Sequence, residues 1–171
     1  YNKYDKAQYL IEQMQQGKDI ALITDAGTPA ISDPGEVLVA ECHKAGVHVT
    51  SLPGPAACIT ALTLSGLSTR RFCFEGFLPS ADDKKARKRI LEDLKTESRT
   101  IILYEAPHHL RAVLDDLYET LGDRMISICR ELTKKFEEVN VTTLEQAIFF
   151  YKENEPRGEY VLVLEGKSLI S

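Results

Sequence analysis

Three stretches of the chain repeat the same order of an amphipathic helical pattern, a glycine and a short apolar run. Apolar positions three and four residues apart indicate a helix, and a short apolar run bounded by turn residues indicates a buried strand. The predicted helix and strand pairs are 4–16 with 20–24, 35–45 with 47–52, and 107–121 with 125–129. Helices that alternate with buried strands predict an α/β fold with mostly parallel pairing.

The remaining periodic segments predict a second sheet with flanking helices. The predicted strands cover 72–75, 100–104, 136–141 and 160–164, and the predicted helices cover 53–64, 83–96 and 143–151. Because 125–132 and 136–141 are close in sequence, we expect them to form a hairpin, which makes this second sheet mixed. The apolar pattern is lost near Ser68. We therefore expect 1–67 to be the carboxy-terminal part of a first α/β domain and 68–171 to be a second one.

Composition restricts the classes of function. The chain has 171 residues, 43% of them hydrophobic, and a net charge of -5, which argues against a protein that coats nucleic acid but allows a local basic patch. Its apolar runs are too short to cross a bilayer. The four cysteines are scattered without metal-ligand spacing, so we expect reduced thiols in a cytoplasmic protein. The first residue is Tyr1 and not Met, so we expect the chain to be part of a longer protein.

Two predicted strand-to-helix loops, 25–35 and 53–57, are candidates for a ligand site. Both follow predicted strands, at the carboxyl ends where open α/β sheets bind ligands. Gly27 allows a ligand to approach the backbone closely, and Asp33 followed by Pro34 predicts a helix N-cap with proline at the first helical position. The alternative is a pair of ordinary connections, one of them a tight turn before a closely packed helix.

Charged residues lie at the ends of three other predicted strands: after two of them and before the third. Tyr104 and Glu105 end one strand, the segment 130–137 follows another with alternating charges, and 157–159 precedes the last. Such residues either line a cleft or form a solvated, salt-bridged edge. The basic run 84–89 either contacts phosphate groups or is the solvated face of its helix. The chain has no dinucleotide-binding glycine motif, P-loop, nucleophile elbow or zinc spacing.

Six ordered motifs resemble those of the bacterial 16S rRNA (cytidine-2′-O)-methyltransferases, a branch of the tetrapyrrole (corrin/porphyrin) methylase superfamily. The motifs cover residues 24–35, 52–57, 74–79, 103–108, 130–134 and 157–163, which extend over about the whole chain. The resemblance implies a two-domain fold that binds S-adenosylmethionine (AdoMet) between its domains. It also implies a homodimer and a substrate cytidine in the decoding region of the small ribosomal subunit.

The resemblance also implies a set of cofactor-binding residues. Gly27-Thr28-Pro29 takes the place of the superfamily's Gly-Asp-Pro loop, a departure typical of the rRNA branch. The implied AdoMet neighbours are Gly27, Thr28, Ile31, Ala56, Ala57, Tyr104, and the backbone around Cys129 and Arg130. In the superfamily an amino-terminal strand and a glycine-containing loop precede the position of Tyr4, so part of the cleft is expected outside this chain.

Methyl transfer from a sulfonium to a ribose hydroxyl needs alignment, exclusion of water and a group that favours ionisation of the hydroxyl. Our candidates for the base or hydroxyl acceptor are Glu105, Glu131 and Glu159, which the sequence does not rank, and Arg130 is the candidate electrostatic group. No metal is needed. The candidate RNA contacts are the basic run 84–89, with Lys84, Lys85, Arg87 and Lys88, and the pair Lys134 and Lys135. Two alternatives stay open: a methylase of a small tetrapyrrole, and a non-catalytic fragment that binds RNA or protein.

Overall fold

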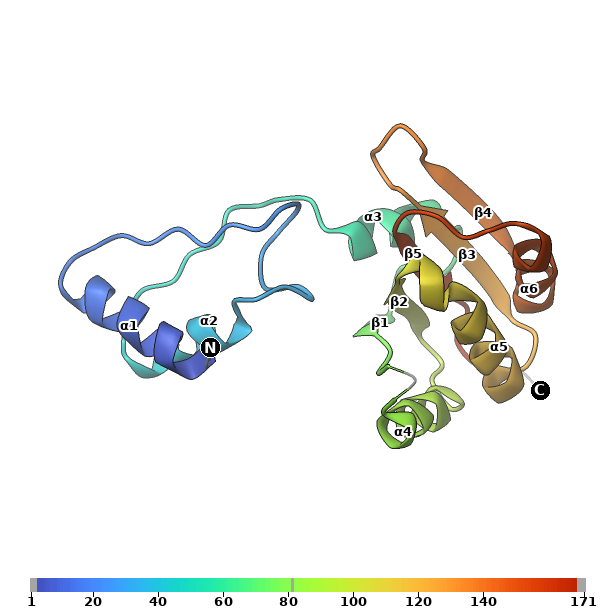
Figure 1. Ribbon diagram of the computed structural model, residues 1–171, viewed down its shortest axis with the longest axis horizontal. Coiled ribbons are helices and arrows are strands. Elements are labelled where there is room, and N and C mark those ends of the chain that lie inside the picture. The colour runs from blue at the N-terminus through green and yellow to red at the C-terminus, as the bar shows by residue number, and fades with distance from the viewer. Residues whose placement is uncertain (1–2, 81, 169–171) are drawn as a thin grey trace. The chain divides into compact units, whose positions relative to one another are not determined.

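The computed structural model describes residues 3–80 and 82–168, and the chain divides into two compact units, Tyr1–Ala56 and Ala57–Ser171 (Figure 1). Each unit is described by itself. The division places helix α3 (Ala57–Leu64), which contacts strands of the second unit, in that unit. The assignment of 1–67 and 68–171 to two domains of the family stays a prediction.

The first unit contains two helices that pack against each other, α1 (Lys3–Gln15) and α2 (Glu36–Lys44). Its buried apolar side chains are Ala7 and Ile11 of α1 and Cys42 of α2. Both helices confirm the sequence prediction because their apolar positions recur at helical spacing. The glycine that follows α1, Gly17, has a φ of 89°, a conformation that stops a helix and favours glycine.

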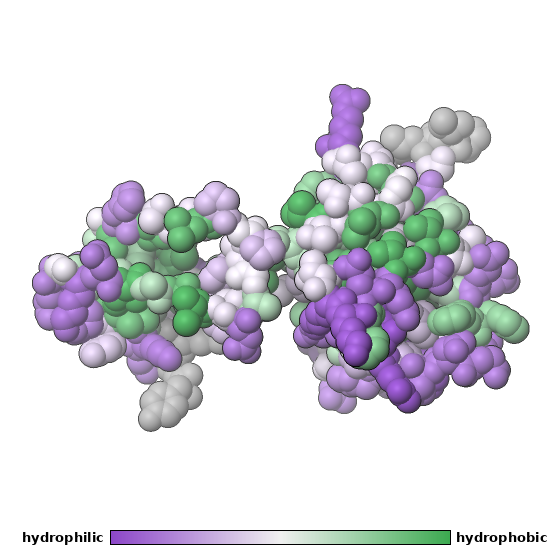
Figure 2. Space-filling model, turned by 90° about the horizontal axis from the view of Figure 1, so that it is seen from above, coloured by the Kyte–Doolittle hydropathy of each residue, from purple (hydrophilic) through white to green (hydrophobic). Residues whose placement is uncertain are grey.

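The two strands predicted in the first unit do not form, and this part of the prediction is wrong for this structure. Residues 20–24 and 47–52 run without strand hydrogen bonding. Their apolar side chains stay exposed, with 83% of Ile23 and 85% of Leu52 accessible. Figure 2 shows such hydrophobic side chains, in green, at the surface of this unit on the left. The reason is that no described segment pairs with either run, and a strand is stable only with a hydrogen-bonded neighbour.

The predicted N-cap at Asp33 is also wrong. Helix α2 begins at Glu36, and its N-cap is Gly35, which makes no side-chain hydrogen bond to the helix. Turns occupy the preceding residues, where Ala30 and Ser32 both have positive φ angles of 66° and 58°. These turns end too late in the sequence for Asp33 to reach the first helical N–H groups.

The second unit is built on a five-stranded sheet in the order β1-β2-β5-β3-β4. The strands are β1 (Phe72–Phe77), β2 (Thr100–Glu105), β3 (Met125–Arg130), β4 (Glu138–Thr143) and β5 (Tyr160–Leu164). The pair β1–β2 is parallel and the other three pairs are antiparallel. The predicted hairpin of β3 and β4 and the predicted mixed sheet are therefore confirmed.

Helices cover both faces of this sheet. The further elements are α4 (Lys84–Leu94), η1 (Pro107–His109), α5 (Leu110–Leu121) and α6 (Leu144–Glu153). One continuous core joins residues of α4, α5 and α6 to Ile101 and Leu103 of β2 and to Leu162 of β5. The buried residues Ile102 and Val163 lie outside that core, and α3 contacts their strands. Since side chains alternate along a strand, α3 covers the opposite face.

Two other expectations concern the composition. All four cysteines are buried free thiols; the apolar segments around Cys58, Cys73 and Cys129 predicted this, whereas Cys42 carried no such prediction. Within 3–80 and 82–168, none of the helices combines the length and the apolar character that crossing a bilayer requires.

Candidate active site

Two loops of the first unit are joined at one backbone carbonyl. The Thr28 N–H donates to the Pro55 carbonyl oxygen at 2.9 Å, and the Thr28 hydroxyl donates to the same oxygen at 3.2 Å. The sequence predicted that the loops 25–35 and 53–57 open on one sheet edge; residues 20–24 and 47–52 form no strands, but the two loops do contact each other. The sequence did not identify Pro55 as the partner of Thr28, because every residue has a backbone carbonyl and no residue type marks the one that accepts a hydrogen bond.

Small residues make this close approach of the loops possible. Gly27 has a φ of 79°, and a Cβ atom added there would lie 3.1 Å from the Pro55 oxygen. A Cβ atom added at Gly54 would lie 3.0 Å from Thr28 Oγ1. The two glycines therefore leave a cradle of backbone atoms that side chains would fill. Ile31, on the same loop, is an exposed apolar side chain.

In the second unit, Tyr104 holds the first turn of helix α3. Its hydroxyl accepts the Cys58 N–H at 3.1 Å, and its ring makes edge contacts with Phe74 and Phe77 at centroid distances of 4.9 and 5.7 Å. The N–H groups of a first helical turn have no partner within the helix, so the tyrosine replaces a side-chain cap. This contact fixes Ala57, the first residue of α3, relative to strand β2.

The sheet register divides the predicted site residues between two faces. Tyr104 and Cys129 both pair with Val161, so their side chains point to the face that α3 covers. Glu105 and Arg130 both pair with Tyr160, and their side chains point to the face of the large core. The side chains of Tyr104 and Cys129 thus share one end of the sheet with those of Glu105 and Arg130, but lie on the other face.

Arg130 is oriented by two partners. Its Nε donates to the Arg157 carbonyl oxygen at 2.7 Å, and its guanidinium forms an ion pair with Glu138 at 2.9 Å. The hydrogen bond that the Arg130 guanidinium donates to the Glu138 carboxylate raises the pKa of Arg130. A charge held in this way is fixed in direction, which an electrostatic role requires.

Glu131, Lys134 and Glu159 form a clamp between the end of β3 and the start of β5. The Glu131 carboxylate accepts the Glu159 N–H at 2.9 Å and the Lys134 ammonium at 3.0 Å, and the same ammonium reaches Glu159 at 2.7 Å. The hydrogen bonds from the Glu159 backbone N–H and from the Lys134 ammonium lower the pKa of Glu131. Gly158 is required beside the clamp because an added Cβ would lie 2.6 Å from Glu131 Cγ. Gly158 was not a predicted site residue. A glycine just before a buried strand is the pattern that could have indicated its role.

Glu105 differs from the other two carboxyl groups. It is buried, and one oxygen accepts the Ala106 N–H at 2.8 Å. Burial raises the pKa of Glu105 above its usual value. The side chain of Glu159, in contrast, is 83% exposed. The three candidates for a base therefore occupy three different environments.

The predicted RNA contacts are not equally available. Lys84, Lys85 and Lys88 are exposed on α4. Arg87 is tied to Asp116 by its Nε at 2.6 Å and to the Pro79 carbonyl oxygen at 3.0 Å. Lys134 belongs to the clamp described above. Of the predicted set, the three lysines of α4 face solvent; Lys134 is exposed too, but Glu131 and Glu159 hold its ammonium.

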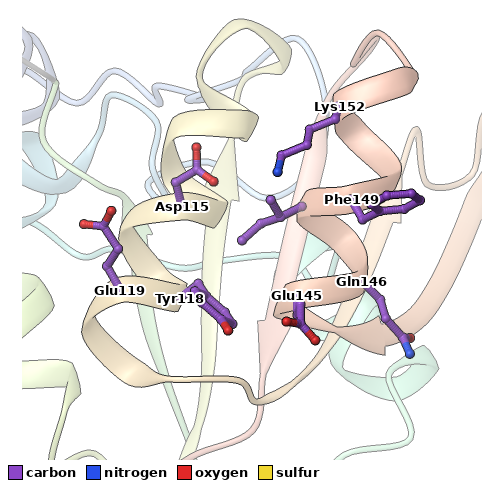
Figure 3. Close-up of a pocket in the computed structure, with 8 residues that line it drawn as sticks. Asp115, Tyr118, Glu119, Glu145, Gln146, Phe149 and Lys152 are labelled. Carbon is purple, nitrogen blue, oxygen red and sulfur yellow. The ribbon is translucent and has the colours of Figure 1, made fainter.

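A cavity of about 680 Å³ lies apart from these residues, between α5 and α6 (Figure 3). Figure 3 shows Lys152 of α6 reaching toward Asp115 of α5, while Phe149 points away from α5. None of the residues that line the cavity was a predicted site residue. In the part of the chain that the structure describes, histidine, cysteine and carboxylate side chains form no group of three that would hold a metal ion.

Known proteins resemble this chain in sequence and in fold. The family model "Tetrapyrrole (Corrin/Porphyrin) Methylases" matches residues 2–148. Proteins named "Ribosomal RNA small subunit methyltransferase I" are 48% identical over 97% of the chain in Synechocystis sp. and 47% identical over 98% in Haemophilus influenzae. The chain spans 59% of the length of both relatives.

Solved structures show the same fold at lower identity. The methyltransferase CobJ superposes with a TM-score of 0.72 at 19% identity, covering 97% of this chain and 72% of that one. A uroporphyrin-III C-methyltransferase from Thermus thermophilus, solved in complex with S-adenosyl homocysteine, has a TM-score of 0.61 at 17% identity, over 96% and 74% of the two chains.

Proposed function

Because the chain belongs to the tetrapyrrole (corrin/porphyrin) methylase family, we propose that the protein transfers a methyl group from AdoMet to ribosomal RNA of the small subunit. The acceptor is the 2′-oxygen of a cytidine in the decoding region, and the protein works as a cytoplasmic homodimer. One observation carries the proposal: Thr28 joins two glycine-containing loops at Pro55, in a chain whose relatives at 44–48% identity are named rRNA methyltransferases.

The loop pair fits a cofactor that is bound largely through backbone atoms. Gly27 and Gly54 have no side chains where the two loops approach each other, and the hydrogen bond from Thr28 to Pro55 sets the distance between the loops. Ile31 is an exposed apolar group that suits a flat purine ring. When bound, AdoMet supplies an activated methyl group on its sulfonium. In the second unit, Tyr104 acts by positioning Ala57 and Cys58 at the start of α3.

The environments of the charged residues suggest a division of roles. A general base works best when its pKa lies near the operating pH, which favours the raised pKa of Glu105 over the lowered pKa of Glu131, whereas the burial of Glu105 on the core face counts against it. The hydrogen bonds of Glu131 suit a positioning role for the turn between the two strands. Glu159 offers a solvent-accessible carboxylate, and Arg130 an oriented positive charge. Lys84, Lys85 and Lys88 are the proposed phosphate contacts on α4.

The test uses the full-length protein, purified 16S rRNA and AdoMet with a labelled methyl group. We expect label in the RNA and, after digestion to nucleosides, in 2′-O-methylcytidine. The substitutions Glu105→Gln, Arg130→Met, Glu131→Gln and Glu159→Gln should lower the rate more than the calorimetric affinity for AdoMet. The matched control is Glu155→Gln, which breaks only an exposed ion pair with Arg111 and should leave both quantities unchanged.

Other outcomes would identify the alternatives. Methylation of a small tetrapyrrole in place of RNA would show that the substrate assignment is wrong. RNA binding without AdoMet binding would indicate a binding protein without turnover. If none of the four substitutions lowers the rate, the assignment of these residues fails while the reaction itself stands.

A further inference from the structure

The connection between β3 and β4 carries an exposed aromatic ring that the proposed site does not use. Figure 1 shows this connection extending beyond the end of the sheet. It contains Phe136, whose side chain is 61% exposed, and the Lys135 ammonium lies 5.5 Å from the centre of the ring. Single exposed apolar side chains are common on protein surfaces, and what distinguishes Phe136 is its place on a projecting turn beside a cation.

The turn that presents the ring is ordered by its own hydrogen bonds. The Lys134 N–H donates to the Glu131 carbonyl at 3.0 Å, the Glu137 N–H donates to the Lys134 carbonyl at 3.2 Å, and the Thr133 N–H reaches the Glu137 carboxylate at 2.5 Å. Glu131 and Thr133 have positive φ angles of 48° and 64°. Non-glycine residues adopt this conformation only where the surroundings impose it. The ring is therefore held outward on a fixed support.

The charges around the ring leave one cation without an acidic partner. Lys134 engages Glu131 and Glu159, Arg130 engages Glu138, and Glu137 accepts a backbone N–H. Among the interactions of the described residues, Lys135 has only its contact with the ring. The turn thus presents an aromatic face together with one positive charge. A ligand that complements both has a flat ring and an adjacent anion.

We propose that Phe136 is a stacking platform for an unpaired base of the RNA substrate, with Lys135 facing the adjacent phosphate. This inference rests on the proposed function, which makes RNA the substrate. Proteins bind single-stranded RNA through aromatic rings that stack on bases and cations that face the backbone. The sequence neighbours of Phe136 on both sides are charged: Lys134 and Lys135 before it, Glu137 and Glu138 after it. This isolation suits stacking of a single base better than a protein interface, where anchors sit in a wider apolar patch.

The 171 residues contain no tryptophan, so a tryptophan introduced among them adds a new fluorophore to the protein. In the full-length protein, Phe136→Trp places a fluorophore at the platform, and Phe149→Trp places a matched one on α6, where Phe149 is 73% exposed. The probe is a single-stranded 16S rRNA fragment that contains the proposed target cytidine, and signals are compared with the parent protein. We expect the RNA to quench the fluorescence at position 136 and to leave that at position 149 unchanged.

Binding measurements separate stacking from charge. Phe136→Ala should weaken RNA binding about tenfold, Phe136→Tyr should retain it, and Phe149→Ala should have no effect. Phe136→Ala should leave the salt dependence of binding unchanged, whereas Lys135→Ala should lower its slope by about one phosphate contact. Bound RNA without quenching at position 136, or full affinity of Phe136→Ala, would overturn the inference.

The outcomes distinguish this inference from the proposed function. If the parent protein methylates RNA and Phe136→Ala binds RNA equally well, the platform is wrong and the methyltransferase stands. If RNA quenches the fluorescence at position 136 but receives no methyl group, the platform stands and the reaction fails. If Phe136→Ala loses binding to a protein of the small subunit but keeps binding to naked RNA, the ligand is protein and the RNA assignment is overturned.

Discussion

The two units of the chain contain similar apolar runs, but only the second unit turns them into a sheet. In the second unit, β5 has hydrogen-bonded neighbours on both sides, and Leu162 in it is fully buried. In the first unit, 20–24 is mostly apolar and 47–52 is half apolar; neither run has a paired neighbour among the described residues, and Leu52 is exposed. An apolar run therefore indicates a segment that is able to form a strand. The neighbouring segments decide whether it does so.

The largest expected difference between the units is in core stability. Leu162→Ala should lower the free energy of unfolding of the 171-residue chain by about 2–5 kcal/mol, because it removes buried methyl groups and leaves a cavity. Leu52→Ala should change it by less than about 0.5 kcal/mol, because the side chain already faces water. Urea unfolding measures both. If Leu52→Ala lowers the free energy of unfolding as much as Leu162→Ala does, residues 47–52 are packed and the two units do not differ in this respect.

A smaller effect tests the one ordered contact between the loops of the first unit. Gly27 and Gly17 both have positive φ, so alanine strains the backbone at either position. Only at Gly27 would the new Cβ meet another group, the Pro55 oxygen. In the full-length protein, Gly27→Ala should weaken AdoMet binding about tenfold, or about 1.4 kcal/mol, and Gly17→Ala should leave it unchanged. If calorimetry shows that both substitutions weaken AdoMet binding equally, backbone strain alone explains the loss and the loop contact has no specific role.

The smallest effects concern two carboxyl groups of the second unit, which should respond to pH in opposite directions. The lowered pKa of Glu131 adds stability above its usual value of 4.5, and this stability is lost as the pH falls through the folded-state pKa. The raised pKa of Glu105 has the reverse sign, because stability is lost as the pH rises through its folded-state value.

At pH 7, Glu131→Gln should therefore destabilise the chain and Glu105→Gln should stabilise it. Both differences should shrink in acid, when the carboxyl groups are protonated in both states. Unfolding curves across the acidic range check the two signs. Shifts of the same sign for both variants would show that their environments do not differ as described.

The elements of the second unit were predictable because their signals are local. Helix α5 has apolar residues on one face and ends before Gly122, and β5 is a short run of apolar residues. The failure at 20–24 has the opposite cause, since pairing depends on residues far away in the sequence. The capping prediction at Asp33 failed because the turns through Ala30 and Ser32 have no local signal for a positive φ.

The candidate site was predictable in outline. The sequence predicts that the Gly27 loop and the loop before Ala57 open on one sheet edge; the strands of that edge do not form, although Thr28 and Pro55 do join the two loops. It also brings Glu105 and Arg130 to one end of the sheet. Glu105 and Arg130 point to one face of the sheet and Tyr104 to the other. This difference follows only from the register of their strands with β5. The environments of the three glutamates depend on partners such as Gly158 and Lys134, which are distant in sequence or carry other signals.

The place of β5 in the sheet has a consequence for synthesis on the ribosome. It is the last strand of the sheet in sequence, yet it lies between β2 and β3. Until Tyr160–Leu164 has left the exit tunnel, the nascent chain holds only the separate pairs β1–β2 and β3–β4. Two-stranded pairs of this kind are marginal in water. The unit therefore acquires its stability only after β5 has emerged, and until then the open edges of β2 and β3 are the surfaces on which a chaperone would act.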